Sequence, residues 1–125
     1  MDIYLKDSKS ILVSGRVSVS LLRESFAVLF PFLELELMIN KRSVSNSDKK
    51  LAELSKNKII VDFEITPEMS VEELENEFEK QFGIEVIIFR RVGASLVRTS
   101  FTKNWSLQHQ NNKGGEILND FGLVK

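Results

Sequence analysis

The sequence SVSLLRESFAVLFPFLELEL (residues 18–37) returns, with the same pattern of serine and apolar positions, as SVEELENEFEKQFGIEVIIF (residues 70–89). The matching positions are 52 places apart, from Ser18 and Ser70 at the start to Phe30 and Phe82 near the end. A match in register over such a length indicates a duplicated structural unit. The repeat therefore predicts how the chain is organised, and it carries no signature of an activity.

The second copy has the clearer helix signals. Ser70 followed by Glu73 is a capping box, in which each side chain bonds a free backbone amide at the start of a helix. The apolar residues that follow recur at spacings of three and four, so they share one stripe of the helix. They are Val71, Leu74, Phe78 and Phe82. Gly83 suits the left-handed conformation that closes a helix, while in the first copy Pro31 cannot continue one.

Each predicted helix lies between two strand candidates. LELELMI (residues 33–39) alternates leucine with glutamate, which is typical of a strand with one buried face and one wet face. IEVIIFRR (residues 84–91) is almost continuously apolar and is expected to lie centrally in a sheet. SILVSG (residues 10–15) precedes the first helix, and KIIVDFEI (residues 58–65) precedes the second.

This order of elements predicts an α+β fold, namely a two-layer α/β sandwich made from a duplicated βαβ unit. The ferredoxin-like βαββαβ topology fits best, with helices covering one face of an antiparallel sheet. An extra strand, ASLVRTSF (residues 94–101), is expected to form a hairpin with IEVIIFRR around Val92 and Gly93, although valine suits tight primed turns poorly. A β-grasp-like fold is the alternative, because IYL and ILV around the polar DSKS can form an N-terminal hairpin.

Length and composition favour one domain. A chain of 125 residues with 42% apolar residues and nine phenylalanines can fill one core. We therefore predict a single domain over residues 1–125. Its repeat units are at about 9–39 and 58–91, and a C-terminal hairpin and tail follow at 92–125.

Charge and hydropathy limit the classes of partner. Seventeen basic and eighteen acidic residues leave a net charge of −1, so any preference for a charged partner must come from a local patch. The N-terminus has no signal-peptide pattern, and the longest apolar run, residues 27–33, is far shorter than the roughly 20 residues that cross a bilayer. We expect a soluble, cytoplasmic protein with no membrane partner.

The residue types needed for catalysis are scarce. There is no cysteine, and His109 is the sole histidine. A nucleophile paired with a histidine base, or a zinc site with three or four nitrogen and sulfur ligands, is therefore not expected. No phosphate-binding, dinucleotide or nucleophile-elbow motif is present. We predict that the protein is not an enzyme, with no catalytic residues, no cofactor and no metal.

A basic segment is one candidate binding site. Its basic and aromatic residues are interleaved in sequence, as in surfaces that bind single-stranded nucleic acid. They are Phe89, Arg90, Arg91, Arg98, Phe101, Lys103 and Trp105. However, the alternation of a strand sends Phe89 and Arg90 to opposite faces. Nucleic acid is therefore the less favoured partner.

The segment NWSLQHQNNKGG (residues 104–115) is the other candidate. Trp105 can anchor it, while Gln110 and Asn111 present amides that donate and accept hydrogen bonds. These residues would then contact a peptide or a small ligand. In the structural alternative, Ser106 caps a short turn that Gly114 ends, and Trp105 packs on the sheet edge.

The C-terminal half resembles a family of uncharacterised bacterial proteins that share this helix, strand and hairpin and then the ending W-[ST]-L-x-x-Q-N-x-x-G. The matching residues are Ser70, Val71, Leu74, Phe78, Phe82, Gly83, Val86, Phe89, Arg90, Trp105, Ser106, Leu107, Gln110, Asn111 and Gly114. The N-terminal half matches only through the strand entry F-P-F-L. The family has no assigned activity, so the resemblance implies a fold unit and no mechanism.

The sequence favours a non-enzymatic protein-interaction or self-association module, with a protein partner or a second copy of the chain as its target. Binding of single-stranded nucleic acid by the basic hairpin, and of a small ligand near Trp105, are the alternatives. The candidate binding residues are Arg90, Arg91, Arg98, Trp105, Gln110 and Asn111.

Overall fold

The computed structural model describes residues 5–6, 9–44 and 47–120. In chain order the elements are β1 (Leu5–Lys6), β2 (Ser10–Val13), α1 (Val19–Leu29), β3 (Leu33–Ile39), β4 (Arg42–Ser43), α2 (Leu51–Leu54), β5 (Phe63–Ile65), α3 (Val71–Phe82), β6 (Glu85–Val92), β7 (Ser95–Arg98), the 3-10 turn η1 (Ser100–Thr102) and α4 (Leu107–Asp120). The last residues of the predicted tail, 121–125, lie outside the described residues.

The described strands form two antiparallel sheets. One has the order β1-β2-β5 and the other has the order β4-β3-β6-β7. Each sheet is built around a pair of strands from different halves of the chain. Ile11 pairs with Ile65 in the first sheet, and Leu35 pairs with Ile88 in the second.

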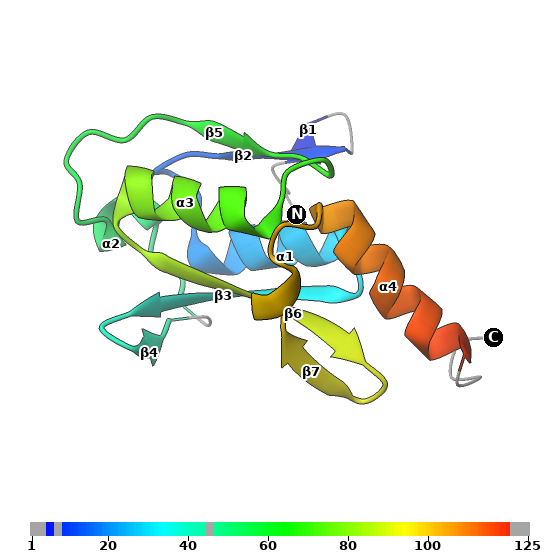
Figure 1. Ribbon diagram of the computed structural model, residues 1–125. Helices are drawn as coiled ribbons and strands as arrows, with labels where there is room; N and C mark the ends of the chain where they lie inside the picture. The colour runs from blue at the N-terminus through cyan, green and yellow to red at the C-terminus, as the bar shows by residue number, and fades with distance from the viewer. Residues whose placement is uncertain (1–4, 7–8, 45–46, 121–125) are drawn as a thin grey trace.

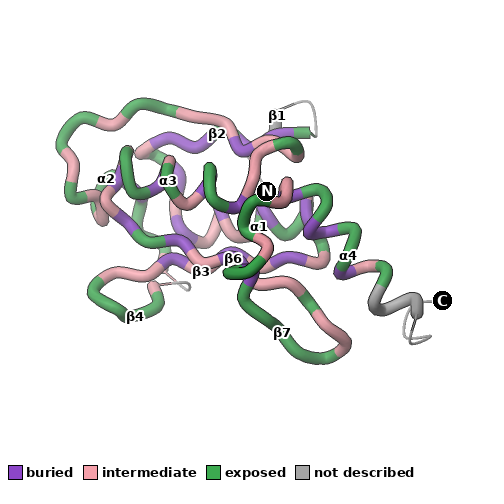
Figure 2. The backbone as a smooth tube through the Cα atoms, viewed as in Figure 1, coloured by how far each residue is buried: buried purple, intermediate pink, exposed green. Residues whose placement is uncertain are grey.

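Helices α1 and α3 lie between the two strand pairs (Figure 1). Helix α1 contacts both β2 and β3, and α3 contacts β6. Helix α3 also meets β5, because the ring of Phe63 packs edge-on against Phe78 at 5.4 Å. The buried residues follow these inner surfaces (Figure 2). The predicted helical stripe of Val71, Leu74, Phe78 and Phe82 is fully buried, as are the equivalent Val19, Leu22, Phe26 and Phe30.

The two helices begin in the same way. The side chain of Ser18 accepts a hydrogen bond from the Leu21 amide at 3.1 Å, and that of Ser70 accepts one from the Glu73 amide at 3.1 Å. Only the second helix has the complete capping box, since Glu73 also accepts from the Ser70 amide at 2.9 Å. Gly83 closes this helix with a φ of 67°, as predicted.

The structural repeat is longer than the repeated sequence. In the first unit (residues 10–54) the segment after the β3–β4 hairpin returns to the start of α1, where Leu51 donates its amide to the Val17 carbonyl at 2.9 Å. In the second unit (residues 63–120) Leu107 donates in the same way to Met69 at 2.8 Å. The one-turn helix α2 therefore corresponds to the first turn of α4, and each unit is β-α-β-β-α.

The α+β class and the sandwich of helices and antiparallel sheets are confirmed. The ferredoxin-like strand order is not found, because the described strands form two sheets on either side of the helices rather than one sheet. The helix of each unit separates its two flanking strands, so each strand pairs with its equivalent in the other unit. The N-terminal hairpin expected of a β-grasp does form, with Leu5 opposite Ile11, but the strand after α1 joins the other sheet.

The extra hairpin strand is present as β7, with a corrected turn. Val92 pairs with Ser95, so the turn residues are Gly93, which has a φ of 63°, and Ala94. Valine thus remains in the strand, and glycine takes the left-handed conformation that the turn needs. Strand β6 lies centrally in its sheet, as predicted.

Candidate functional site

The six candidate binding residues fall in three different places. Arg90, Trp105, Gln110 and Asn111 lie together where α4 packs on β3 and β6. Arg91 and Arg98 line two separate surface grooves. A binding role for these residues stays a prediction, whereas their contacts within the fold are defined.

Gln110 connects the sheet to the segment before α4. It is fully buried, its Oε1 accepts a hydrogen bond from Arg90 Nη1 at 2.9 Å, and its Nε2 donates to the Thr102 carbonyl at 2.7 Å. The guanidinium of Arg90 also lies over the Trp105 ring, 5.6 Å from its centre. Arg90 Nε is buried with no hydrogen-bond partner in the described structure, so the guanidinium is stabilised by its bond to Gln110 and by the face of Trp105.

Asn111 holds the other side of α4. Its Oδ1 accepts a hydrogen bond from the Phe32 amide at 2.8 Å, at the entry to β3. Gly114 lies against the same residue, because a Cβ at Gly114 would stand 2.7 Å from the Phe32 Cβ. The prediction that Gly114 ends a short turn is wrong, since α4 continues to Asp120. Because Gly114 has no side chain, α4 can instead pack closely against Phe32.

The ending W-[ST]-L-x-x-Q-N-x-x-G is thus explained by the docking of α4. Ser106 caps the helix, accepting from the His109 amide at 3.1 Å, and Leu107 enters the core. His109 is exposed and its ring lies 4.4 Å from that of Trp105. No group of three or more histidine, aspartate or glutamate side chains in the described residues could hold a metal ion.

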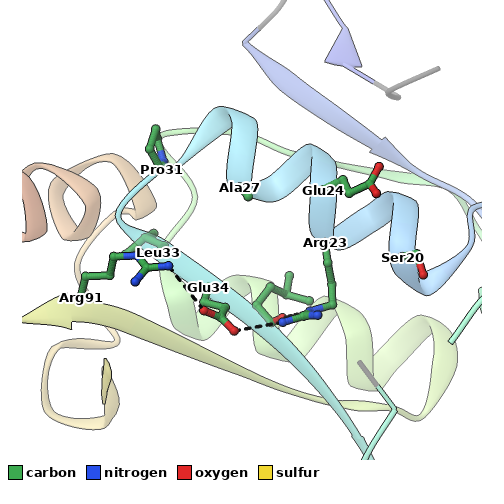
Figure 3. Close-up of a pocket in the computed structure, with 9 residues that line it drawn as sticks. Ser20, Arg23, Glu24, Ala27, Pro31, Leu33, Glu34 and Arg91 are labelled. Atoms are coloured by element: carbon green, nitrogen blue, oxygen red, sulfur yellow. Dashed lines mark hydrogen bonds and ion pairs between the residues drawn. The ribbon is translucent and has the colours of Figure 1, made fainter. Parts of the chain in front are cut away.

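The first groove lies between α1 and the beginning of β3 (Figure 3), with a volume of about 340 Å³. Arg23 of α1 and Arg91 of β6 approach Glu34 from opposite sides, with N–O distances of 3.0 and 3.9 Å. Arg23 Nε also donates to the Leu35 carbonyl at 2.8 Å. This arginine therefore satisfies a backbone acceptor on the outer edge of β3.

The second groove has the equivalent place between α3 and the beginning of β6, with a volume of about 360 Å³. Glu75 and Glu79 stand 52 positions after Arg23 and Ala27 of the first groove. Arg98, at the end of β7, and Lys103, after η1, complete its lining. The first groove has two arginines around Glu34, with Glu24 also in its lining, whereas the second has three glutamates, Glu75, Glu79 and Glu85, and two cations.

Glu75, in the second groove, has a pKa above its ordinary value. Its carboxyl is partly removed from water, and this raises its pKa. The nearby charges of Lys103 and Arg98 act in the opposite direction, while Glu72 and Glu85 raise the pKa further. Because the first cause is desolvation, the cations neutralise this carboxylate only in part.

Strand β7 presents the most open edge of the two sheets. All of its residues, Ser95–Arg98, are exposed, including Leu96 and Val97 at 39% each. Phe101 of η1, just beyond the strand, is fully exposed. We call Leu96, Val97, Arg98, Phe101 and Lys103 the β7 surface. The sequence predicted this strand over residues 94–101, whereas it ends at Arg98 and Phe101 lies in η1. Nothing in the sequence distinguished Phe101 from a core phenylalanine.

The other described edges are shorter or covered. Strands β1 and β4 have two residues each, and β5 has three. Along the outer edge of β3, Arg23 bonds the Leu35 carbonyl, and the Val44 amide bonds the Leu37 carbonyl at 3.0 Å. Only β7, among the described edge strands, combines four residues in a row with a free side.

No family model, curated protein or solved structure matches the chain. The likeness to uncharacterised bacterial proteins therefore stays a prediction. Among residues 5–6, 9–44 and 47–120, no helix has the length and apolar character needed to cross a bilayer.

Proposed function

We propose that the protein is a non-enzymatic protein-interaction module that binds an extended segment of a partner protein along β7. The observation that carries the proposal is the bare edge of β7, exposed at every residue and bordered by Phe101. An edge strand offers a row of backbone donors and acceptors, and natural proteins usually shorten or cover such edges. The equivalent strand of the first unit, β4, has only two residues, and the outer edge of β3 beyond it is covered by Arg23 and Val44, whereas β7 is left open.

The pairing of β6 with β7 fixes which backbone groups are available. Thr99 donates its amide to the Ile88 carbonyl at 3.2 Å, and Arg90 pairs with Val97 two positions away. In an antiparallel ladder, alternate residues point their backbone groups to opposite sides. The amides and carbonyls of Leu96 and Arg98 therefore point away from β6, toward an added strand.

A second copy of the chain is a poorer occupant than another protein. Two β7 strands joined edge to edge would bring the two copies of Arg98, which has no ion pair in the described structure, close together in one continuous sheet. Like charges brought close in this way are destabilising. Ile59 and Val61 are also strongly exposed, but they lie in the irregular chain before β5 and offer no strand edge.

The test uses peptides recovered from a random nonapeptide phage library with the immobilised protein. Their binding sites are mapped by titrating the ¹⁵N-labelled protein and following its amide shifts. The expected result is that the largest changes occur at Leu96, Arg98 and Phe101. Leu96→Pro should abolish binding, because proline removes an amide that points outward and leaves the bonds to β6 intact.

Leu96→Val is the matched control, since it keeps both the amide and an apolar side chain. Recovered peptides that map elsewhere, or that bind Leu96→Pro and the parent protein equally, would overturn the proposal.

Sedimentation at high concentration tests the homodimer, and a fluorescent oligothymidylate tests single-stranded nucleic acid. If the oligonucleotide binds tightly and no peptide is recovered, the partner of the protein would be single-stranded nucleic acid instead of a protein segment.

A further inference from the structure

The charges of the chain are divided between two neighbouring stretches of sequence. Residues 62–85 contain nine acidic residues and one basic residue, Lys80. The acidic residues are Asp62, Glu64, Glu68, Glu72, Glu73, Glu75, Glu77, Glu79 and Glu85. Residues 86–115 contain no acidic residue and five basic residues, which are Arg90, Arg91, Arg98, Lys103 and Lys113. The net charge of −1 conceals this separation.

Three of the five basic side chains already have partners. Arg90 is bonded to Gln110 and covered by Trp105. Lys113 pairs with Glu116 at 3.5 Å, and Arg91 lies 3.9 Å from Glu34. The side chains of Arg98 and Lys103 make no hydrogen bond or ion pair in the described part of the chain. These two cations belong to the β7 surface.

The place of Arg98 on the strand brings its charge to the open edge. Directly opposed side chains of neighbouring strands lie about 5 Å apart at their Cβ atoms, and opposite charges there stabilise the pair. Arg98 faces Phe89 on the β6 side, which cannot neutralise it. A residue of an added strand beside Arg98 is therefore favoured when it is aspartate or glutamate.

The neighbouring glutamates do not fully satisfy the two cations. Glu75 is the carboxyl on which both Arg98 and Lys103 act, and its burial disfavours the charged form. Glu79 and Glu85 line the same groove, and in the described structure no ion pair within 4.0 Å joins Glu75, Glu79 or Glu85 to either cation. An incoming carboxylate that remains exposed to solvent bears a smaller desolvation cost than Glu75 does.

We infer that the segment bound by β7 is acidic and extended, with at least one carboxylate beside Arg98 and Lys103 and apolar residues beside Leu96 and Val97. The inference rests on the proposed function and adds the chemical class of the partner. Electrostatic attraction to the β7 surface also speeds the encounter and makes it sensitive to salt.

The test compares synthetic peptides by fluorescence anisotropy. The best nonapeptide from the library is measured beside a version in which every Asp and Glu is replaced by Asn and Gln. The expected loss of affinity is about five- to tenfold at low salt, from one or two exposed charge pairs. Raising the salt to about 0.5 M should remove most of that difference.

The protein variant Arg98→Glu should weaken the acidic peptide by more than tenfold and should favour a version carrying lysine at the same positions. Lys80→Glu, on the exposed side of α3, is the matched control for net charge and should leave both affinities unchanged. If both variants lose affinity for the acidic peptide equally, the effect comes from the overall charge of the protein and not from Arg98, and the inference is overturned.

Different results would overturn the acidic partner and the addition of a strand to β7. Peptides that map to β7 but show no acidic enrichment, or no loss on neutralisation, would overturn the acidic partner and leave strand addition in place. Acidic peptides that bind without shifting Leu96 and Arg98, and bind Leu96→Pro as well, would overturn strand addition itself.

Discussion

The two units of this protein share a framework and differ at its edges. In the first unit, Arg23 reaches from α1 to the Leu35 carbonyl and covers the outer edge of β3. In the second unit, Glu75 takes the helix position of Arg23. There the longer strand β7 covers the outer edge of β6, and Thr99 donates its amide and its hydroxyl to the Ile88 carbonyl. The exposed edge is thereby moved outward to β7. The two units therefore share their core contacts and differ in their surface residues.

The largest expected effect comes from removing a buried phenylalanine from either unit, which tests whether the two units contribute equally to the stability of the core. Phe26→Ala and Phe78→Ala each remove a fully buried ring, so each should cost about 3–5 kcal/mol of unfolding free energy. Phe78 should lie at the upper end, because it packs on Phe63 as well as Phe82. Urea denaturation measures both, with the exposed Val28→Ala as control. A cost below 1 kcal/mol for either would show that the two cores are not equivalent.

The second prediction concerns α4, which has only a one-turn counterpart in the first unit. Gly114→Ala should destabilise the protein by about 1–3 kcal/mol, since the new Cβ meets the Cβ of Phe32. Gly115→Ala meets only the outer ring atoms of Phe32, which can move, and helix propensity alone favours alanine by up to about 1 kcal/mol. Thermal melts of both variants separate the two effects. Stabilisation by Gly114→Ala would contradict the close docking.

The third prediction compares the helix caps. Ser18→Ala and Ser70→Ala should each cost about 1 kcal/mol, with more at Ser70, where the capping box is reciprocal. Hydrogen bonds from Ser70 lower the pKa of Glu73 below its ordinary 4.5, so the stability that Glu73 contributes is present above that pH and is lost as the pH falls through the lowered value. The extra cost at Ser70 should therefore shrink in acid. An unchanged difference between pH 7 and pH 3 would argue against the box.

The fourth prediction opens the covered edge. Arg23→Ala removes the donor at Leu35 and should cost about 1 kcal/mol. It should also produce concentration-dependent association in sedimentation runs, because β3 then presents free acceptors. Arg23→Lys retains the charge but not the planar Nε donor, so it separates edge coverage from charge. A strictly monomeric Arg23→Ala would show that the arginine is dispensable there.

The smallest effect concerns Glu75. A raised pKa means that the folded state holds the proton more strongly than the unfolded state does, so this group favours folding at low pH, and the benefit is lost as the pH rises through its folded value. At pH 7 the partly buried carboxylate is charged, which is unfavourable. Glu75→Gln removes this charge and should stabilise the protein by about 0.5 kcal/mol or less. The gain should vanish near pH 4. Glu24→Gln, at an exposed position of α1 that does not act on Glu75, provides the control.

Much of the framework could be predicted from the sequence because its signals are local. The serine caps, the apolar stripes and Gly83 are set by residues within one helix, and all are found as predicted. The pairing of strands is different, since alternation identifies the face of a strand and not its partner. The two-sheet arrangement could not be derived for that reason.

The candidate site was predicted unevenly on similar grounds. Trp105, Gln110 and Asn111 were singled out by their polarity and spacing, and they do cluster with Arg90, as the contacts that hold α4. The exposure of Phe101 depends on the turn η1 after β7, and no periodic pattern in the sequence predicts this turn. The covered edge of β3 could not be predicted either, because it depends on the contact of Arg23 with Leu35, which joins residues twelve positions apart.

The pairing of equivalent strands also bears on how the chain folds. Ladders β2–β5 and β3–β6 both join residues about 50 positions apart, so neither unit can complete a sheet by itself. Long loops must close before either ladder forms, which favours slow, all-or-none folding over stepwise assembly. A fragment of one unit could satisfy its strands only by pairing with a second molecule, and this makes exchange of halves between chains the natural route to misassembly.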